Sequence, residues 1–327
     1  MKIMIGIAVI ISFFIVSWVT PWVISYMKNL GVVVKDQHKE NKPLIPISGG
    51  LAVFFGIFFG IMSVIFIQTF YYHSVSMVIE LFAFSLSLFA ITFVGFFDDM
   101  LIRKDKESSF GLKQWQKPLM TVIAAVPLMV VNAGQSLMYI PFLGVVDVGL
   151  LYTFLFIPIG VIGASNMVNL LGGFNGLETS LGIIYIGSLS VYAYAVDSQI
   201  AAIIGFVTVL ALLSFLYFNW TPAKIFPGDS LTYLLGGVLA SMAILGNIEK
   251  AALIVSIPFF IEIILKLRGK LKKQSYGKIV DGRIYSLYNK IYSLPHFFTI
   301  KGRYTEKQVV FFVCFIELVF CSGLLLI

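Results

Sequence analysis

Two adjacent carboxylates, Asp98 and Asp99, end a long apolar stretch in the sequence FVGFFDDM at residues 93–100. A charged side chain near the centre of a bilayer costs at least about 2.5–3.5 kcal/mol on insertion scales, so this pair requires an explanation. Adjacent residues of a helix point about 100° apart, so one carboxylate can face a ligand while the other faces a metal ion or a neighbouring helix. The competing explanation is a solvated helix end that nearby cations balance.

Two lysines follow the carboxylates in the sequence LKQWQKPLM. Lys113 and Lys117 are four residues apart, so they are expected to share one helix face where the chain enters the membrane again. Two ammonium groups on one face suit a ligand that is rich in phosphate. Lysines at a membrane interface also extend along apolar surface to reach water, which is the alternative interpretation.

The second polar group is SNMVNLLGGFNGLE at residues 165–178. Asn166 and Asn169 are three residues apart, which places both amides on one helix face. Amides in apolar surroundings must be hydrogen-bonded or ligate an ion, and neutral oxygens suit a hard cation. The glycine turn GGFNG at 172–176 lets backbone N–H groups approach a ligand. Helix packing through small residues would explain the glycines but not the three asparagines.

Two further groups are FNWTPAKIFPGDSLTYLLGG at 218–237 and VVVKDQHKENKPLIPISGG at 32–50. Asp229 lies in a Pro-Gly turn before a predicted helix, where a carboxylate is either a helix cap or a metal ligand. Phe226 precedes it by three residues and offers a ring face on which a base could stack. A lone histidine, His38, stands in the charged loop of the other group, and we expect it at the surface.

The elements that must position these residues are transmembrane helices. Of the 327 residues, 59% are hydrophobic and 12% are charged, which excludes an ordinary soluble domain. Apolar runs of about 20 residues can cross a bilayer as helices. The sequence therefore predicts an all-α bundle of about ten transmembrane helices in one domain over residues 1–327. The predicted spans lie near 3–26, 49–69, 78–97, 117–131, 150–168, 178–196, 199–217, 230–246, 250–267 and 308–327.

Basic residues concentrate on one side of this arrangement. Of the 23 lysines and arginines, all but Lys2 and Lys250 lie in the loops of that side or at the bordering span ends. Short cytoplasmic loops are enriched in such residues, so this side is predicted to be cytoplasmic and both termini to be outside. All four polar groups lie on it. The loops of this side are 27–48, 98–116, 169–177, 218–229 and the long, basic loop 268–307, which either anchors at anionic lipid or covers an anionic substrate.

Hard oxygen ligands, lysines and glycine turns at a membrane interface suit a magnesium-dependent reaction on phosphates. A secondary transporter is the remote alternative, because it also carries carboxylates and amides within its spans. Transport predicts polar groups near the middle of the membrane and usually repeated halves. Here the polar groups lie at one side, and the sequence shows no internal repeat.

At these residues the sequence resembles the polyprenyl-phosphate N-acetylhexosamine-1-phosphate transferase superfamily (glycosyltransferase 4 family), whose members are ten-span membrane enzymes. GFFDDM resembles the family's Asp-Asp motif, NMVNLLGGFNGLE its Asn-x-x-Asn motif with the glycine turn, and FPGD its Gly-Asp motif. The resemblance covers residues 35–310, with the motifs in the family's order. The glycine turn and NW-x-P are similar to the eukaryotic and archaeal branch, and YNKIYSLPH and TEKQVV are similar to archaeal members.

The resemblance implies transfer of N-acetylglucosamine-1-phosphate from UDP-N-acetylglucosamine to dolichyl or another polyprenyl phosphate, with release of UMP. This is the first step of lipid-linked oligosaccharide assembly for protein N-glycosylation. An undecaprenyl-phosphate sugar-1-phosphate transferase of cell-wall or surface-polymer synthesis is the alternative. The resemblance also implies Mg²⁺, with Mn²⁺ as a substitute, and an archaeal plasma membrane with the site facing the cytoplasm. Family members often form homodimers, and no nucleic-acid partner is expected.

The resemblance also implies roles for residues at the matching positions. Asn169 and Asp229 would ligate magnesium on the nucleotide diphosphate. Asp98 or Asp99 would orient or deprotonate the lipid phosphate, and Lys117 would hold phosphate.

For the nucleotide, the resemblance implies that Gly173 and Asn175 read uracil and that Phe226 stacks on it. The chain departs from the family at Ile47, which follows Pro46 where an acidic residue is usual. The Arg-His-Arg sugar-binding loop of eukaryotic members is also not recognisable. The remaining candidates for phosphate or sugar binding are Lys113, Asn166, Arg283, His296, Lys301 and Arg303.

Overall fold

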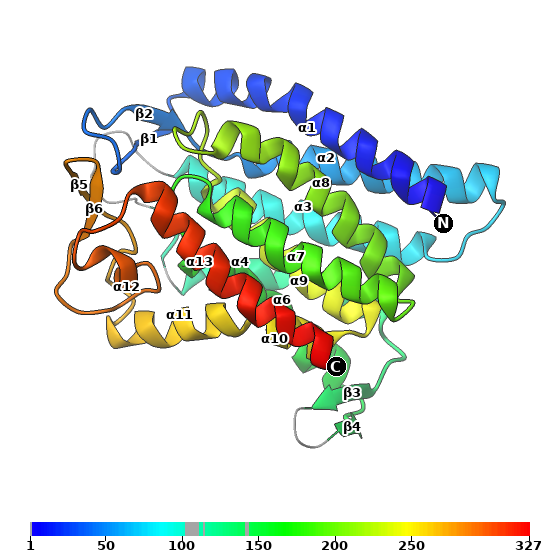
Figure 1. Cartoon of the computed structure of the whole chain (residues 1–327). Helices are drawn as coiled ribbons and strands as arrows, with labels where there is room; N and C mark the ends of the chain where they lie inside the picture. Colours follow the sequence, from blue (N-terminus) through cyan, green and yellow to red (C-terminus); the bar gives the residue numbers. More distant parts are fainter. Residues whose placement is uncertain (1, 102–110, 114, 141–143) are drawn as a thin grey trace.

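The computed structural model describes residues 2–101, 111–113, 115–140 and 144–327, so part of the predicted loop 98–116 lies outside the described residues. Most of the described chain forms helices that lie side by side in a bundle (Figure 1). The long helices are α1 (Lys2–Leu30), α2 (Gly50–Phe66), α3 (Val78–Met100), α6 (Ile157–Leu170), α7 (Leu177–Ala195), α8 (Gln199–Asn219), α9 (Gly228–Gly246), α11 (Ile257–Arg268) and α13 (Glu306–Cys321). The short ones are α4 (Gln116–Thr121), α5 (Val126–Val131), α10 (Glu249–Val255) and α12 (His296–Thr299).

Seven of the described helices are long and apolar enough to cross a membrane, which confirms a mostly helical, multi-pass membrane protein. The predicted span near 117–131 is a shorter apolar helix, Gln116–Val131, and α7 is less apolar than the seven. The predicted span at 250–267 is divided at Ser256 into α10 and α11, and Pro258, which has no N–H, lies in the first turn of α11. The count of ten spans therefore stays a prediction. The seven helices are Ile3–Leu30, Gly50–Tyr71, Val78–Met100, Tyr152–Leu170, Gln199–Asn219, Gly228–Gly246 and Glu306–Leu326.

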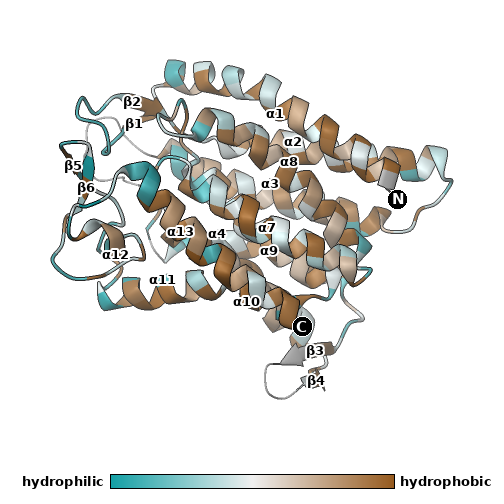
Figure 2. Cartoon of the chain, viewed as in Figure 1, coloured by the Kyte–Doolittle hydropathy of each residue, from teal (hydrophilic) through white to brown (hydrophobic). Residues whose placement is uncertain are grey.

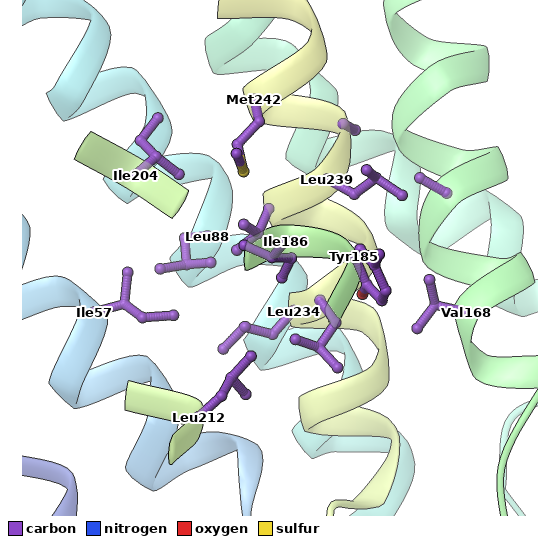
Figure 3. Packing of buried hydrophobic residues seen from close by; sticks show 14 of the residues in the cluster. Ile57, Leu88, Val168, Tyr185, Ile186, Ile204, Leu212, Leu234, Leu239 and Met242 are labelled. Atoms are coloured by element: carbon purple, nitrogen blue, oxygen red, sulfur yellow. The ribbon is translucent and has the colours of Figure 1, made fainter. Parts of the chain in front are cut away.

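Helix α9 lies at the centre of the bundle. Of its most apolar window, 83% is buried, compared with 28% for α1 at the periphery. Figure 3 shows Leu234 of α9 among Leu88 of α3, Tyr185 of α7 and Leu212 of α8, all of which are fully or almost fully buried. This central position brings the first turn of α9, which carries Asp229, against the ends of α3 and α6.

Within the described residues, three antiparallel hairpins depart from the all-α expectation, and each has only two short strands. Two of them lie at the end of the bundle where α13 begins, and the third lies at the other end (Figure 1). Figure 2 shows that hydrophilic residues gather at the end with two hairpins, which we call the polar end. The hairpins of the polar end are β1 (Val33–Lys35) with β2 (Leu44–Pro46) and β5 (Gly277–Val280) with β6 (Arg283–Ser286); the third is β3 (Leu137–Ile140) with β4 (Gly144–Asp147).

The long loop 268–307 contains β5, β6 and α12 and is tied to α11 by buried polar contacts. The carboxylate of Glu262 accepts hydrogen bonds from the Ser293 hydroxyl (2.6 Å) and the Leu294 N–H (2.7 Å). The ammonium of Lys266 donates to the Ser275 hydroxyl (2.6 Å). Because buried polar groups are costly unless they are paired, these contacts hold the loop in one conformation over the polar end.

Candidate active site

Three charged side chains meet at the polar end, and we call them the carboxylate–lysine cluster. They are Asp98 at the end of α3, Lys117 in the first turn of α4 and Asp229 in the first turn of α9. The Lys117 ammonium lies 2.6 Å from Asp98 Oδ2 and 2.6 Å from Asp229 Oδ2. The side chains of Lys117 and Asp229 remain 22% and 25% exposed, whereas that of Asp98 is only 3% exposed. A ligand can therefore reach the cluster through Lys117 and Asp229.

The carboxylate of Asp99 accepts hydrogen bonds from Ser48 and from the start of α9. Its Oδ1 accepts the N–H of Asp229 (2.7 Å), and its Oδ2 accepts the Ser48 hydroxyl (2.9 Å) and the N–H of Ser230 (3.2 Å). The first N–H groups of a helix have no partner within the helix, and a negative charge near them is favourable. The two adjacent carboxylates thus differ: Asp98 contacts the lysine, and Asp99 joins α3 to the first turn of α9.

Two glycines allow this close approach of α3 and α9. A side chain at Gly95 of α3 would overlap the backbone of Asp229. Gly228 has a φ of +71°, which disfavours other residues, and a side chain there would overlap the carboxylate of Asp99. Substituting either glycine would therefore push apart the elements that carry the carboxylates.

The two asparagines of α6 take different positions. Asn169 joins the carboxylate–lysine cluster, because its Nδ2 donates to Asp229 Oδ2 (3.2 Å) and its Oδ1 accepts the hydroxyl of Thr232 (2.9 Å). Asn166 donates to the carbonyl of Ile162 in its own helix (2.8 Å) and lies 3.4 Å from the Thr121 hydroxyl. Only Asn169 contacts a carboxylate of the cluster directly.

The glycine turn after α6 is partly exposed. Gly173 is exposed and has a φ of +96°, and its N–H donates to Glu178 Oε1 (2.7 Å). Asn175 is buried and tied to residues of other segments. The loop that carries the half-buried Phe226 lies beside the turn, because Thr221 of that loop contacts the carbonyl oxygen of Asn175 (3.5 Å).

The expected surface position of His38 is wrong. Its side chain is 2% exposed, and its Nδ1 lies 3.0 Å from Glu306 Oε1 at the start of α13. Asp36 and Lys39 lie beside this pair, since the Lys39 ammonium contacts both Glu306 and Asp36, and we call Asp36, His38, Lys39 and Glu306 the histidine cluster. The charged local sequence indicated exposure, whereas the decisive partner, Glu306, is far away along the chain.

The remaining predicted phosphate and sugar ligands lie in the segment before α4 and in the long loop. Lys113 precedes α4, which begins at Gln116, and it is exposed, so the expected shared helix face with Lys117 is not formed. His296 is fully buried, accepts the N–H of Tyr292 at Nδ1 (3.1 Å) and lies 3.0 Å from the Gln274 carbonyl at Nε2. Burial lowers the pKa of His296 to about 4. Arg283, Lys301 and Arg303 are exposed in the long loop.

Tyr233 is a member of the site region that the sequence pattern did not single out. It lies one helical turn after Asp229 on α9 and is fully buried, with its ring centroid 5.8 Å from the Lys117 ammonium. Its hydroxyl has no hydrogen-bond partner within the described part of the chain. The signal was its spacing from Asp229, since residues four apart share a helix face.

An apolar groove of about 300 Å³ runs between α6, α9, α10 and α11. Near one end lies the hydrogen bond from the Tyr152 hydroxyl to Glu249 Oε1 (2.8 Å). The groove also reaches Met167, which precedes Asn169 by two residues. Small residues keep it open along α6, namely Gly160, Gly163 and Ala164.

These features define a helical membrane protein with carboxylates, an amide and a lysine gathered at one end of the bundle, and with an apolar groove that reaches Met167, two residues before Asn169. Residues 81–247 match the family described as Glycosyl transferase family 4, and the chain belongs to this family. Family membership favours an enzyme over a transporter.

Several relatives are similar over nearly their whole length. A protein of Saccharolobus solfataricus is 35% identical over 95% of this chain and 93% of its own, and one of Sulfolobus acidocaldarius is 32% identical over 96% and 93%. Both carry the provisional name UDP-N-acetylglucosamine–dolichyl-phosphate N-acetylglucosaminephosphotransferase. A phospho-N-acetylmuramoyl-pentapeptide-transferase of Staphylococcus epidermidis is 31% identical over 94% of this chain and 95% of its own.

Proposed function

We propose that this protein transfers N-acetylglucosamine-1-phosphate from UDP-N-acetylglucosamine to dolichyl or another polyprenyl phosphate and releases UMP. The observation that carries the proposal is the carboxylate–lysine cluster at the end of a bundle whose apolar groove reaches Met167, two residues before Asn169, in a chain whose archaeal relatives carry this name. Such a site can hold a phosphate at its polar part while a hydrocarbon chain remains in apolar surroundings.

In the proposed reaction, an oxygen of the lipid phosphate forms a bond to the sugar-bearing phosphorus of the donor. The bond from that phosphorus to the bridging oxygen breaks, and UMP leaves with the electron pair. Asp98 would accept the proton of the lipid phosphate, since it is the carboxylate of the adjacent pair that contacts Lys117. Lys117 would offset phosphate charge, and Asp99 would be a positioning residue that holds α9.

Mg²⁺, or Mn²⁺ in its place, is the proposed cofactor. The carboxylate oxygens of Asp98 and Asp229 converge on the Lys117 ammonium, and hard divalent cations prefer such ligands. Asn169 faces Asp229 through its NH₂ group, and its amide would turn to offer its oxygen to the ion. The Lys117 ammonium already bridges the two carboxylates, so the space between Asp98 and Asp229 accommodates a positive charge. When bound, the ion would neutralise charge on the diphosphate of the donor.

The other parts of the substrates would occupy neighbouring surfaces. The groove that reaches Met167 would hold the polyprenyl chain. Gly173, Asn175 and Phe226 would bind the uracil base, since they lie on adjacent loops of the polar end. We further propose a homodimer in an archaeal plasma membrane, with the polar end in the cytoplasm and a role at the start of protein N-glycosylation.

The Staphylococcus relative favours one alternative, an undecaprenyl-phosphate sugar-1-phosphate transferase. Purified protein in detergent, supplied with Mg²⁺ and a polyprenyl phosphate, should release UMP from UDP-N-acetylglucosamine and not from UDP-N-acetylmuramoyl-pentapeptide. The reverse preference would establish the alternative. No UMP from any UDP-sugar, with protein that melts cooperatively, would refute both.

A further inference from the structure

We propose that Asp36 and Glu306 fix the side-chain amide of Asn175 with its carbonyl oxygen toward the nucleotide, and thereby select a base that presents an N–H. Uracil presents such a group at N3, whereas cytosine presents an acceptor at the same position. This inference rests on the proposed function and deepens it, because it assigns the choice of nucleotide to two carboxylates that do not contact the base.

The direction of the Asn175 amide follows from its partners. Nδ2 donates to Asp36 Oδ2 (2.9 Å) and to Glu306 Oε2 (3.3 Å), and the backbone N–H donates to Glu306 Oε1 (2.9 Å). An ionised carboxylate only accepts hydrogen bonds, so the NH₂ group and not the oxygen must face the two acids. Both amide hydrogens are then used, and Oδ1 is the atom left for a ligand.

Lys39 and His38 hold these two carboxylates in place. The Lys39 ammonium lies 2.6 Å from Glu306 Oε2 and 3.6 Å from Asp36 Oδ2, so the chain supplies its own cation to the pair. The backbone N–H of His38 donates to Asp36 Oδ1 (2.9 Å). His38 Nε2 accepts the N–H of Gly277 (3.2 Å), so Nδ1 carries the proton and donates to Glu306 Oε1 (3.0 Å). Every donor in this network therefore has a defined direction.

The location of Asn175 fits a base-reading residue. It belongs to the turn that follows α6, the helix that carries Asn169 of the carboxylate–lysine cluster, and it lies near the exposed Gly173. Thr221, from the loop that carries Phe226, contacts its backbone carbonyl. A fixed acceptor at this point pairs with the N3–H of uracil and opposes the lone pair of cytosine N3, and an unpaired polar group in a binding site lowers affinity strongly.

Nucleotide binding to the full chain in detergent tests the proposal without turnover. The wild-type protein should bind UMP at least about tenfold more tightly than CMP and N3-methyl-UMP, because both analogues lack the N3–H. This measurement uses only the wild-type protein, and equal binding of UMP and N3-methyl-UMP would overturn the proposal.

The role of the two acids is tested by Glu306→Gln and Asp36→Asn, which replace an obligate acceptor by a group that can also donate. The Asn175 amide can then rotate, and the ratio of CMP to UMP dissociation constants should fall toward one. Glu40→Gln, at an exposed position of the same loop, is the matched control and should keep the wild-type ratio. A wild-type ratio in folded Glu306→Gln and Asp36→Asn would overturn the role of the acids.

The proposed function and the role of the two acids are refuted by different results. Absence of UMP release in the transfer assay refutes the proposed function, whereas an unchanged UMP preference in an active variant refutes only the further inference. If Glu306→Gln melts too low to assay, Asp36→Asn and the N3-methyl-UMP measurement still decide.

Discussion

Replacing each member of the adjacent aspartate pair by asparagine should separate chemistry from stability. Asp98 contacts Lys117 in the carboxylate–lysine cluster, and the Leu112 N–H donates to its other oxygen. In Asp98→Asn, the new NH₂ group faces either the Leu112 N–H or the Lys117 ammonium. Both donors are partly exposed, so water can replace the lost acceptor and the loss of stability should be smaller than in Asp99→Asn. If Asp98 accepts the proton of the lipid phosphate, UMP release should fall about 10²- to 10⁴-fold, the usual contribution of a positioned base.

Asp99→Asn should instead lower stability. In either orientation of the new amide, its NH₂ group faces the backbone N–H of Asp229 or that of Ser230, so one of these donors loses its acceptor. An unsatisfied buried donor costs about 1–3 kcal/mol, and the lost charge near the start of α9 adds about 0.3–1 kcal/mol. The sum, roughly 1–4 kcal/mol, corresponds to a fall in melting temperature of roughly 2–6 °C for a chain of 327 residues.

The assay combines melting of each variant in detergent with initial rates of UMP release below the melting range. Each variant is the control for the other, because both remove one negative charge from adjacent positions. The expected result is a stable, nearly inactive Asp98→Asn and a destabilised Asp99→Asn that keeps measurable activity. A fully active Asp98→Asn together with a stable, inactive Asp99→Asn would refute the division of roles.

Three further predictions concern metal, packing and pH. Asp229→Asn should weaken the binding of Mg²⁺, so UMP release should fall and recover in part at high Mg²⁺; wild-type activity at low Mg²⁺ would remove Asp229 from the site. Gly95→Ala should lower both the melting temperature and activity, because its methyl group meets the Asp229 backbone, and unchanged melting would contradict the close approach of α3 and α9. Burial lowers the pKa of His296 from 6.5 to about 4. As the pH falls, the imidazole is therefore protonated in the unfolded chain before it is protonated in the folded protein. The free energy of unfolding should keep its full value above pH 6.5 and fall by up to roughly 3 kcal/mol as the pH drops from 6.5 to 4. The melting temperature should depend less steeply on pH in His296→Gln than in the wild-type protein, and an equal dependence would exclude this effect.

The sequence predicted those features that depend on local spacing. Long apolar runs identified most of the helices, and the polar groups at their ends indicated one shared face, where Asp98, Lys117, Asn169 and Asp229 do meet. Helical spacing within a segment and the side on which each loop lies are sufficient for that inference.

Features that depend on contacts between distant segments were not predictable in the same way. The division between Asp98 and Asp99 depends on how α3 is rotated against α9, and that rotation follows from a close approach at Gly95. The charged neighbours of His38 predict a surface position, but the ring is buried against Glu306, which lies far along the chain. Local composition carries no information about either contact.

The carboxylate–lysine cluster and the histidine cluster are joined by one short segment, residues 169–175. Asn169, in the last turn of α6, contacts Asp229, and Asn175, in the turn that follows the helix, contacts Asp36 and Glu306. In the proposed function the carboxylate–lysine cluster holds the phosphates, and the histidine cluster orients Asn175, which reads the base. The length of this turn then sets the distance between the phosphate site and the base site. The N–H of Gly277 in the long loop donates to His38 and so joins this loop to the histidine cluster. A change in the loop should therefore affect the preference for uracil more strongly than the rate of phosphate transfer.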